Sequence, residues 1–251
     1  MNEPIDTEKK RRRGIYLLPN LFTTAALFAG FYAIINGMNG HFEAAAIAIF
    51  IAMVLDGLDG RVARMTNTQS DFGEQYDSLA DLISFGLAPA LVMYEWALAD
   101  MGKLGWLAAF IYTATAALRL ARFNAQIGSA DKRYFTGLPS PSAAGVVAGM
   151  VWVANDYQIS GDQLVWYAFG LTISIGLLMV SNIRYRSFKD LDLKGKVPFV
   201  TIIVVVLVYV LITIDPPQVL FSIFAAYAIS GVIGTMLLIR KIRRERKKSG
   251  E

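Results

Sequence analysis

The sequence lacks cysteine and contains little histidine and little charge. Its 251 residues include no cysteine, a single histidine, His41, and only 18% charged residues. The missing cysteines exclude a disulfide framework, a thiolate zinc site and a cysteine nucleophile. Any metal must therefore be bound by oxygen ligands or by the one histidine. In soluble globular proteins about a quarter of the residues are charged. The low charged fraction of this chain therefore argues against an ordinary soluble domain.

Apolar residues are what the sequence has in excess. They make up 55% of the chain, and the mean hydropathy is +0.46. A helix needs roughly 20 apolar residues to cross a bilayer, and the chain divides into about eight such segments. We therefore predict an all-α fold, a polytopic membrane bundle of about eight transmembrane helices. The expected spans are 17–36, 42–65, 75–98, 104–124, 141–156, 162–182, 197–214 and 218–239.

The basic residues lie at the edges of these segments. With eight crossings, all of the 24 basic residues except Lys103 fall on the side that holds both termini. Cytoplasmic loops retain lysine and arginine during insertion, so both termini are expected in the cytoplasm, and the protein in the cytoplasmic membrane. Residues 1–13 and 240–251 are expected to be flexible basic tails next to anionic lipids. This placement explains the net charge of +4 without a nucleic-acid partner.

Four aspartates interrupt the second and third spans. Asp56 and Asp59 are three residues apart, and Asp77 and Asp81 are four apart, so each pair shares a helix face. Acidic residues at mid-bilayer cost roughly 2.5–3.5 kcal/mol each, so a cluster of them indicates function. Two helices joined by a short loop would bring the four carboxylates together. We predict that they bind a divalent cation.

The ligand chemistry favours a hard cation. Carboxylate oxygens suit Mg²⁺ or Mn²⁺, and Ca²⁺ also fits. Four carboxylates have enough oxygen atoms for two ions. Gly57, Gly60 and Gly73 leave room beside the carboxylates, either for a ligand such as a pyrophosphate or for a closely packed neighbouring helix. The glycines alone do not decide between a bound ligand and a closely packed helix.

The aspartates belong to a longer pattern. The string Asp56-x-x-Asp59-Gly60-x-x-Ala63-Arg64, followed after eight residues by Gly73-x-x-x-Asp77-x-x-x-Asp81, resembles the signature of the CDP-alcohol phosphotransferase family. The resemblance covers about the first six spans. It implies an intramembrane enzyme that transfers a phosphatidyl or similar group from a CDP-linked donor to an alcohol and releases CMP. It also implies a homodimer.

Three further blocks, 18–23, 119–124 and 134–141, are similar to the integral-membrane phosphatidylserine synthases of that family. This similarity implies that CDP-diacylglycerol is the donor and L-serine the acceptor, with phosphatidylserine and CMP as products. One alternative is the same reaction with glycerol 3-phosphate or inositol phosphate as acceptor. An alternative of another class is an ion-coupled membrane transporter, because buried carboxylates often mark ion paths.

The resemblance also assigns roles to residues of a single membrane-embedded domain, 1–251, with its catalytic core at about 15–190. The four aspartates would bind the metal ions on the cytosolic side of the membrane, and Asp81 is the candidate base for the serine hydroxyl. The residues expected around the cytidine and diphosphate are Asn20, Thr23, Gly60, Ala63, Arg64, Gly73 and Ser78. Those expected to bind the acceptor are Arg119, Arg122 and Asn124.

Overall fold

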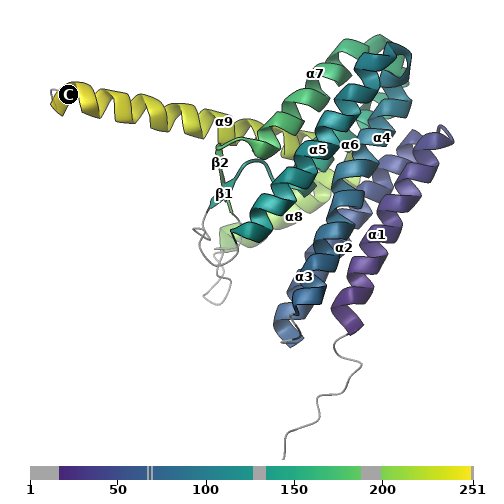
Figure 1. The fold of residues 1–251 in the computed structure, drawn as a ribbon, viewed down its shortest axis with the longest axis horizontal. Helices are drawn as coiled ribbons and strands as arrows, with labels where there is room; N and C mark the ends of the chain where they lie inside the picture. Colours follow the sequence, from purple (N-terminus) through teal and green to yellow (C-terminus); the bar gives the residue numbers. More distant parts are fainter. Residues whose placement is uncertain (1–16, 67, 69, 127–133, 188–198, 250–251) are drawn as a thin grey trace, which may run out of the picture.

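The computed structural model describes residues 17–66, 68, 70–126, 134–187 and 199–249. This part of the chain forms a helical bundle with one small antiparallel strand pair (Figure 1). Its first half consists of α1 (Leu17–Met38), α2 (Phe42–Thr66), a long helix over 71–101 and α5 (Lys103–Ala125). Its second half consists of α6 (Ser140–Asp156), α7 (Gly161–Val180), α8 (Phe199–Ile214) and α9 (Pro216–Ser249).

Five helices of the described chain are long and apolar enough to cross a membrane, as expected for a membrane protein. They are Pro19–Met38, Asp71–Met101, Lys103–Ala125, Gly161–Val180 and Pro216–Arg240. Helix α2 has 25 residues but carries the first aspartate pair, and α6 and α8 have only 17 and 16 residues. The membrane character of the fold is thereby supported, while the count of about eight spans and the side of the termini stay predictions.

The long helix over 71–101 changes its winding along its length. It consists of α3 (Asp71–Asp81), a π-helical stretch (Leu82–Leu87), α4 (Ala88–Met93), a second π-helical stretch (Tyr94–Leu98) and a 3-10 turn (Ala99–Met101). Pro89 follows the first π-helical stretch, and a proline cannot donate to the carbonyl four residues earlier. That carbonyl, on Phe85, accepts a hydrogen bond of 3.2 Å from the Tyr112 hydroxyl of α5. The carbonyl to which Pro89 cannot donate therefore still has a hydrogen-bond partner.

Helix α6 lies at the centre of the bundle. Most of its residues are buried, and it packs against α2, α4, α7 and α9. Close approach through small residues holds membrane helices together, because lipid offers no hydrophobic contrast. Helix α1 and the long helix also approach closely through a small residue. A methyl group on Gly30 of α1 would lie 2.6 Å from Ser84 Oγ. The Ser84 hydroxyl donates to the Ala26 carbonyl at 3.0 Å.

The structure differs from the expected fold in two places. Strands β1 (Tyr134–Thr136) and β2 (Arg184–Arg186) pair antiparallel, with Phe135 opposite Tyr185, so the fold is not purely helical. The prediction of a flexible tail from residue 240 was wrong for 240–249, because α9 runs to Ser249 and extends away from the bundle (Figure 1). Arginine, lysine and glutamate are good helix formers, which explains the continuation. Residues 1–13 and 250–251 lie outside the described residues.

Candidate active site

Three carboxylates meet where α2 and α3 lie side by side. Oxygen atoms of Asp56, Asp59 and Asp77 lie within 4.8 Å of one another, and Asp59 and Asp77 contact each other directly. Asp81 lies one helical turn beyond Asp77, outside this group of three, and its carboxyl group contacts that of Asp56. The structure thus brings together all four of the aspartates that the sequence singled out, three of them in one group.

The chemistry of this group fits a divalent cation. Three carboxylates at such short separations repel one another, and their donor atoms are all oxygen, the ligand that hard cations prefer. Among the described residues, Arg64 lies near Asp59, and Arg119 lies near Asp56 and Asp81. These two arginines do not compensate the negative charge of four carboxylates. A divalent cation held by Asp56, Asp59 and Asp77 would supply the missing positive charge.

Helix α1 orients the Asp59 carboxylate. The Thr23 hydroxyl donates to Asp59 Oδ2 at 2.8 Å, and it also lies 3.2 Å from the Pro19 carbonyl oxygen. Both Thr23 and Asp59 are buried. A second link between α1 and α3 joins the hydroxyl oxygens of Thr24 and Tyr76 at 2.9 Å. Thr23, expected near the nucleotide, therefore supports a carboxylate.

The start of α3 brings two of the predicted nucleotide residues together. Ser70 caps the helix by accepting a hydrogen bond from the Gly73 amide at 3.1 Å, as N-cap serines do. A methyl group on Gly73 would lie 3.2 Å from Ser70 Oγ and 3.5 Å from Asn20 Oδ1. Asn20 of α1 and Gly73 are therefore neighbours.

The glycines of α2 face open space. Among the described residues outside the helix's own backbone, a methyl group on Gly57 would meet nothing within 4 Å, and one on Gly60 only Arg64 Nη1 at 3.6 Å. Close helix packing therefore does not explain either glycine. The observation favours room for a ligand. Arg64 is exposed and Ala63 is half-buried beside this space.

Ser78 and Asn124 link the two predicted binding regions. The Asn124 side-chain amide donates to Ser78 Oγ at 2.9 Å, which joins α3 to the end of α5. Ser78 was expected at the diphosphate and Asn124 at the acceptor. Their contact places these two regions next to each other.

Arg119 and Arg122 have different surroundings. Arg119 is 9% exposed, and its Nη1 donates to Ser140 Oγ at 2.8 Å. Its Nε is buried without a hydrogen-bond partner among the described residues. Arg122 donates to Asn182 Oδ1 at 2.8 Å and to the Val180 carbonyl at 3.4 Å. Arg119 also interacts electrostatically with Asp81 and Asp56.

The sequence model of the CDP-alcohol phosphatidyltransferase family matches residues 16–178, a stretch that holds every predicted site residue. The chain belongs to this family. The resemblance drawn from the aspartate spacing is thereby confirmed.

Individual relatives of this CDP-alcohol phosphatidyltransferase carry more specific names. A CDP-diacylglycerol–serine O-phosphatidyltransferase of Helicobacter pylori is 37% identical over 235 residues, which cover 94% of this chain and 98% of the relative. A protein of the same name from Methanocaldococcus jannaschii is 39% identical over 142 residues, 57% of this chain and 63% of the relative. An archaetidylserine synthase of Methanothermobacter thermautotrophicus is 33% identical over 178 residues, 70% and 72% of the two chains.

Sequence reasoning missed several residues that shape the site of this CDP-alcohol phosphatidyltransferase. Ser70 had a local signal, because a serine directly before Asp71 is typical of a helix start. Ser140 opens α6 after Pro139 and is fully buried, but nothing in the sequence pairs it with Arg119. Tyr76 had no signal beyond its position on the aspartate-bearing helix.

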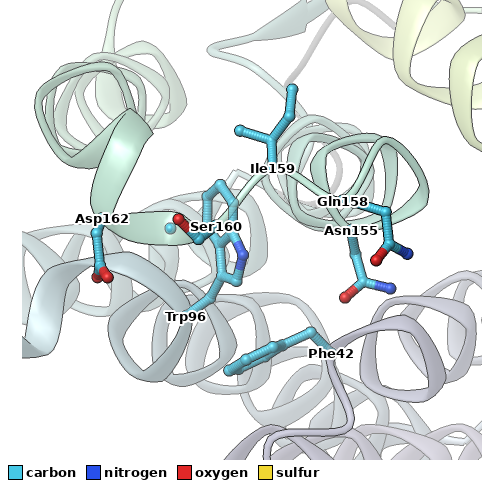
Figure 2. Close-up of a pocket in the computed structure, with 8 residues that line it drawn as sticks. Phe42, Trp96, Asn155, Gln158, Ile159, Ser160 and Asp162 are labelled. Atoms are coloured by element: carbon cyan, nitrogen blue, oxygen red, sulfur yellow. The ribbon is translucent and has the colours of Figure 1, made fainter.

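A pocket of about 340 Å³ lies elsewhere in this phosphatidyltransferase (Figure 2). It is lined by Phe42, Trp96, Asn155, Gln158, Ile159, Ser160, Gly161 and Asp162. These residues come from the start of α2, the end of the long helix and the α6–α7 connection. The aspartates lie toward the opposite ends of α2 and of the long helix, so the pocket is separate from the carboxylate site.

Proposed function

We propose that the protein transfers the phosphatidyl group of CDP-diacylglycerol to the hydroxyl of L-serine, giving phosphatidylserine and CMP. The observation that carries the proposal is the group of three carboxylates beside a buried arginine. It occurs in a chain that is similar over almost its full length to a protein named for this reaction. Carboxylates suit a metal-bound diphosphate, and a guanidinium suits the carboxylate of an amino acid.

The donor side of the site is formed by α1, α2 and α3. Asp56, Asp59 and Asp77 would hold the metal, with Asp81 completing a site for two ions, Mg²⁺ or Mn²⁺. When bound, the cations neutralise charge on the phosphoryl oxygens during attack and ease the departure of CMP. The residues that would surround the cytidine and diphosphate are Asn20, Gly60, Ala63, Arg64, Gly73 and Ser78, with Thr23 orienting Asp59.

The chemical step needs one base. Asp81 interacts both with Asp56, of the proposed donor site, and with Arg119, of the proposed acceptor site. Its carboxylate would take the proton of the serine hydroxyl as the hydroxyl oxygen attacks the β-phosphorus. The new phosphorus–oxygen ester bond forms as the bond to the bridging oxygen breaks, and CMP leaves with that oxygen. No covalent enzyme intermediate is required.

The acceptor side is formed by α5. Arg119 is the proposed ligand of the serine carboxylate, because its buried Nε has a donor that no described residue uses. Arginine binds planar carboxylates with two parallel hydrogen bonds. Asn124 lies within reach of Ser78 and would border the acceptor from the diphosphate side. Arg122, held by Asn182 and Val180, would contribute positive charge at the edge of the site.

We extend the proposal to the whole chain. It forms one membrane-embedded domain with a catalytic core at about 15–190, close to the matched stretch. The site opens to the cytosolic side of the cytoplasmic membrane, where serine is available, and the acyl chains of the donor stay among lipids. The protein acts as a homodimer with both termini in the cytoplasm.

The test is an acceptor screen on the purified protein. CMP release from CDP-diacylglycerol is followed with L-serine, glycerol 3-phosphate and inositol phosphate in turn, each with and without Mg²⁺ or Mn²⁺. Release that requires both L-serine and a divalent cation is expected. Release only with one of the phosphorylated acceptors would overturn the serine assignment, and release with none of them would overturn the proposed reaction.

A further inference from the structure

Helix α9 lies beyond the matched family region, but its first half packs closely against the bundle. A methyl group on Gly145 of α6 would lie 2.6 Å from the Phe224 ring, and one on Gly149 would lie 3.1 Å from Phe221 Cα. A methyl group on Gly231 of α9 would lie 2.3 Å from the Tyr185 ring. Phe221, Phe224 and Gly231 share one face of α9 by their spacing. These contacts fix the position of α9 along α6.

The strand pair β1–β2 is tied to α9 through Tyr185. This side chain is 1% exposed, and its hydroxyl donates to the Ala228 carbonyl at 3.0 Å. Burial raises the pKa of Tyr185 to about 12. Phe135 of β1 lies opposite Tyr185 in the ladder.

Tyr227, one residue before Ala228, reaches the strand pair and the acceptor side. Its hydroxyl donates to the Arg186 carbonyl at 3.1 Å, and its ring centroid lies 5.5 Å from that of Tyr185. The side chain also lies close enough to Arg119 for an electrostatic interaction. Tyr227 is thus an α9 residue that both bonds to the strand pair and interacts electrostatically with the buried guanidinium.

The strand pair leads directly to the partner of Arg119. After β1, the Gly137 amide donates to the Ile183 carbonyl at 2.8 Å, and the Leu138 amide donates to the Leu178 carbonyl at 3.0 Å. Two residues later, Ser140 accepts the hydrogen bond of Arg119. A shift of the strand pair would therefore move Ser140 and, with it, the guanidinium.

We propose that Tyr227 is a positioning residue of the acceptor site and that α9 is part of the catalytic unit. Tyr227 bonds to β2, whose ladder leads to Ser140, and it interacts electrostatically with Arg119, so it holds the guanidinium where the carboxylate of the amino-acid acceptor binds. This inference rests on the proposed transfer to L-serine. It adds a C-terminal helix, outside the matched region, to the residues that determine acceptor affinity.

The first test removes only the hydroxyl. Tyr227→Phe is expected to raise the KM for L-serine about fivefold, as the loss of one hydrogen bond would, and to leave the KM for CDP-diacylglycerol within about twofold. Tyr209→Phe on α8, whose side chain is 71% exposed, is the matched control and is expected to change neither KM. An unchanged serine KM in Tyr227→Phe, or equal changes for both substrates, would overturn the inference.

A second test asks whether Tyr227 acts through Arg119. In an Arg119→Lys background, Tyr227→Phe is expected to change the serine KM by less than about twofold, because residues that act together are not additive. Additive effects would overturn the inference. Failure of the proposed function would give a different result. Neither the wild-type protein nor the Tyr227→Phe variant would then release CMP with L-serine.

Discussion

The carboxylate group and the arginine group of the site are assembled in different ways. The carboxylate group, Asp56, Asp59 and Asp77, comes from two helices joined by one short connection. The arginine group, Arg119, Ser140 and Tyr227, comes from three helices, α5, α6 and α9, and α9 lies far from the other two in the sequence. Asp81 lies between them and interacts with both.

The two groups also carry opposite charges and are therefore suited to ligands of opposite charge. Clustered carboxylates require a cation, because their mutual repulsion is strong at short range. The buried arginine has a donor that no described residue uses, and a buried donor without a partner costs free energy until a ligand pairs with it. The two groups are therefore suited to different substrates, a metal-bound diphosphate and an anionic acceptor. Each prediction below separates one group from the other.

The largest effect is expected from removing divalent cations. A chelator should abolish CMP release, and added Mg²⁺ or Mn²⁺ should restore it, because Arg64 and Arg119 do not compensate the charge of the four carboxylates. The measurement is CMP release against free metal concentration at saturating serine. Full activity in the chelator would contradict the metal site.

Substitution within the carboxylate group should come next. Asp59→Asn keeps the shape of the side chain but removes its charge, and it should lower kcat about 100-fold or more. The control is Asp71→Asn, an exposed position in the first turn of α3, which should retain nearly full activity. Comparable losses in the two variants would show that the effect is not specific to the carboxylate group.

The two arginines of α5 allow a sharper comparison. Arg119→Lys should raise the KM for L-serine about tenfold, because lysine cannot make the paired hydrogen bonds of a guanidinium. Arg122→Lys should change it by less than about threefold, because the Arg122 guanidinium is already bonded to Asn182 and to the Val180 carbonyl. Steady-state kinetics with serine and CDP-diacylglycerol varied separately measure both. An equal rise in the two variants would refute the assignment of Arg119 as the carboxylate ligand.

The smallest effect is expected at the glycines. Gly60→Ala should raise the KM for CDP-diacylglycerol about fivefold by filling the space that we assign to the diphosphate, an effect of about 1 kcal/mol. Gly170→Ala on α7 also adds a methyl group where nothing lies within 4 Å. It should leave kinetics unchanged and stabilise the helix by about 0.5–1 kcal/mol. Thermal unfolding in detergent checks that neither variant is destabilised.

Much of the fold could be predicted from apolar runs alone. The expected spans agree with the helices to within a few residues at most boundaries, because a long apolar run is the main part of most of these helices. The strand pair was missed because three-residue strands carry almost no periodic signal. The helical continuation of α9 was missed because a basic, polar run indicates a helix only weakly without an apolar face.

The carboxylate group was determined by the sequence itself. Residues three or four apart on one helix share a face whatever surrounds them, and a short connection leaves two such faces few ways to meet. The arginine group was decided only by the tertiary structure. Arg119 and Arg122 are also three residues apart on one helix, so spacing does not distinguish them. Packing does, because the start of α6 places Ser140 beside Arg119, while the end of α7 places Asn182 beside Arg122.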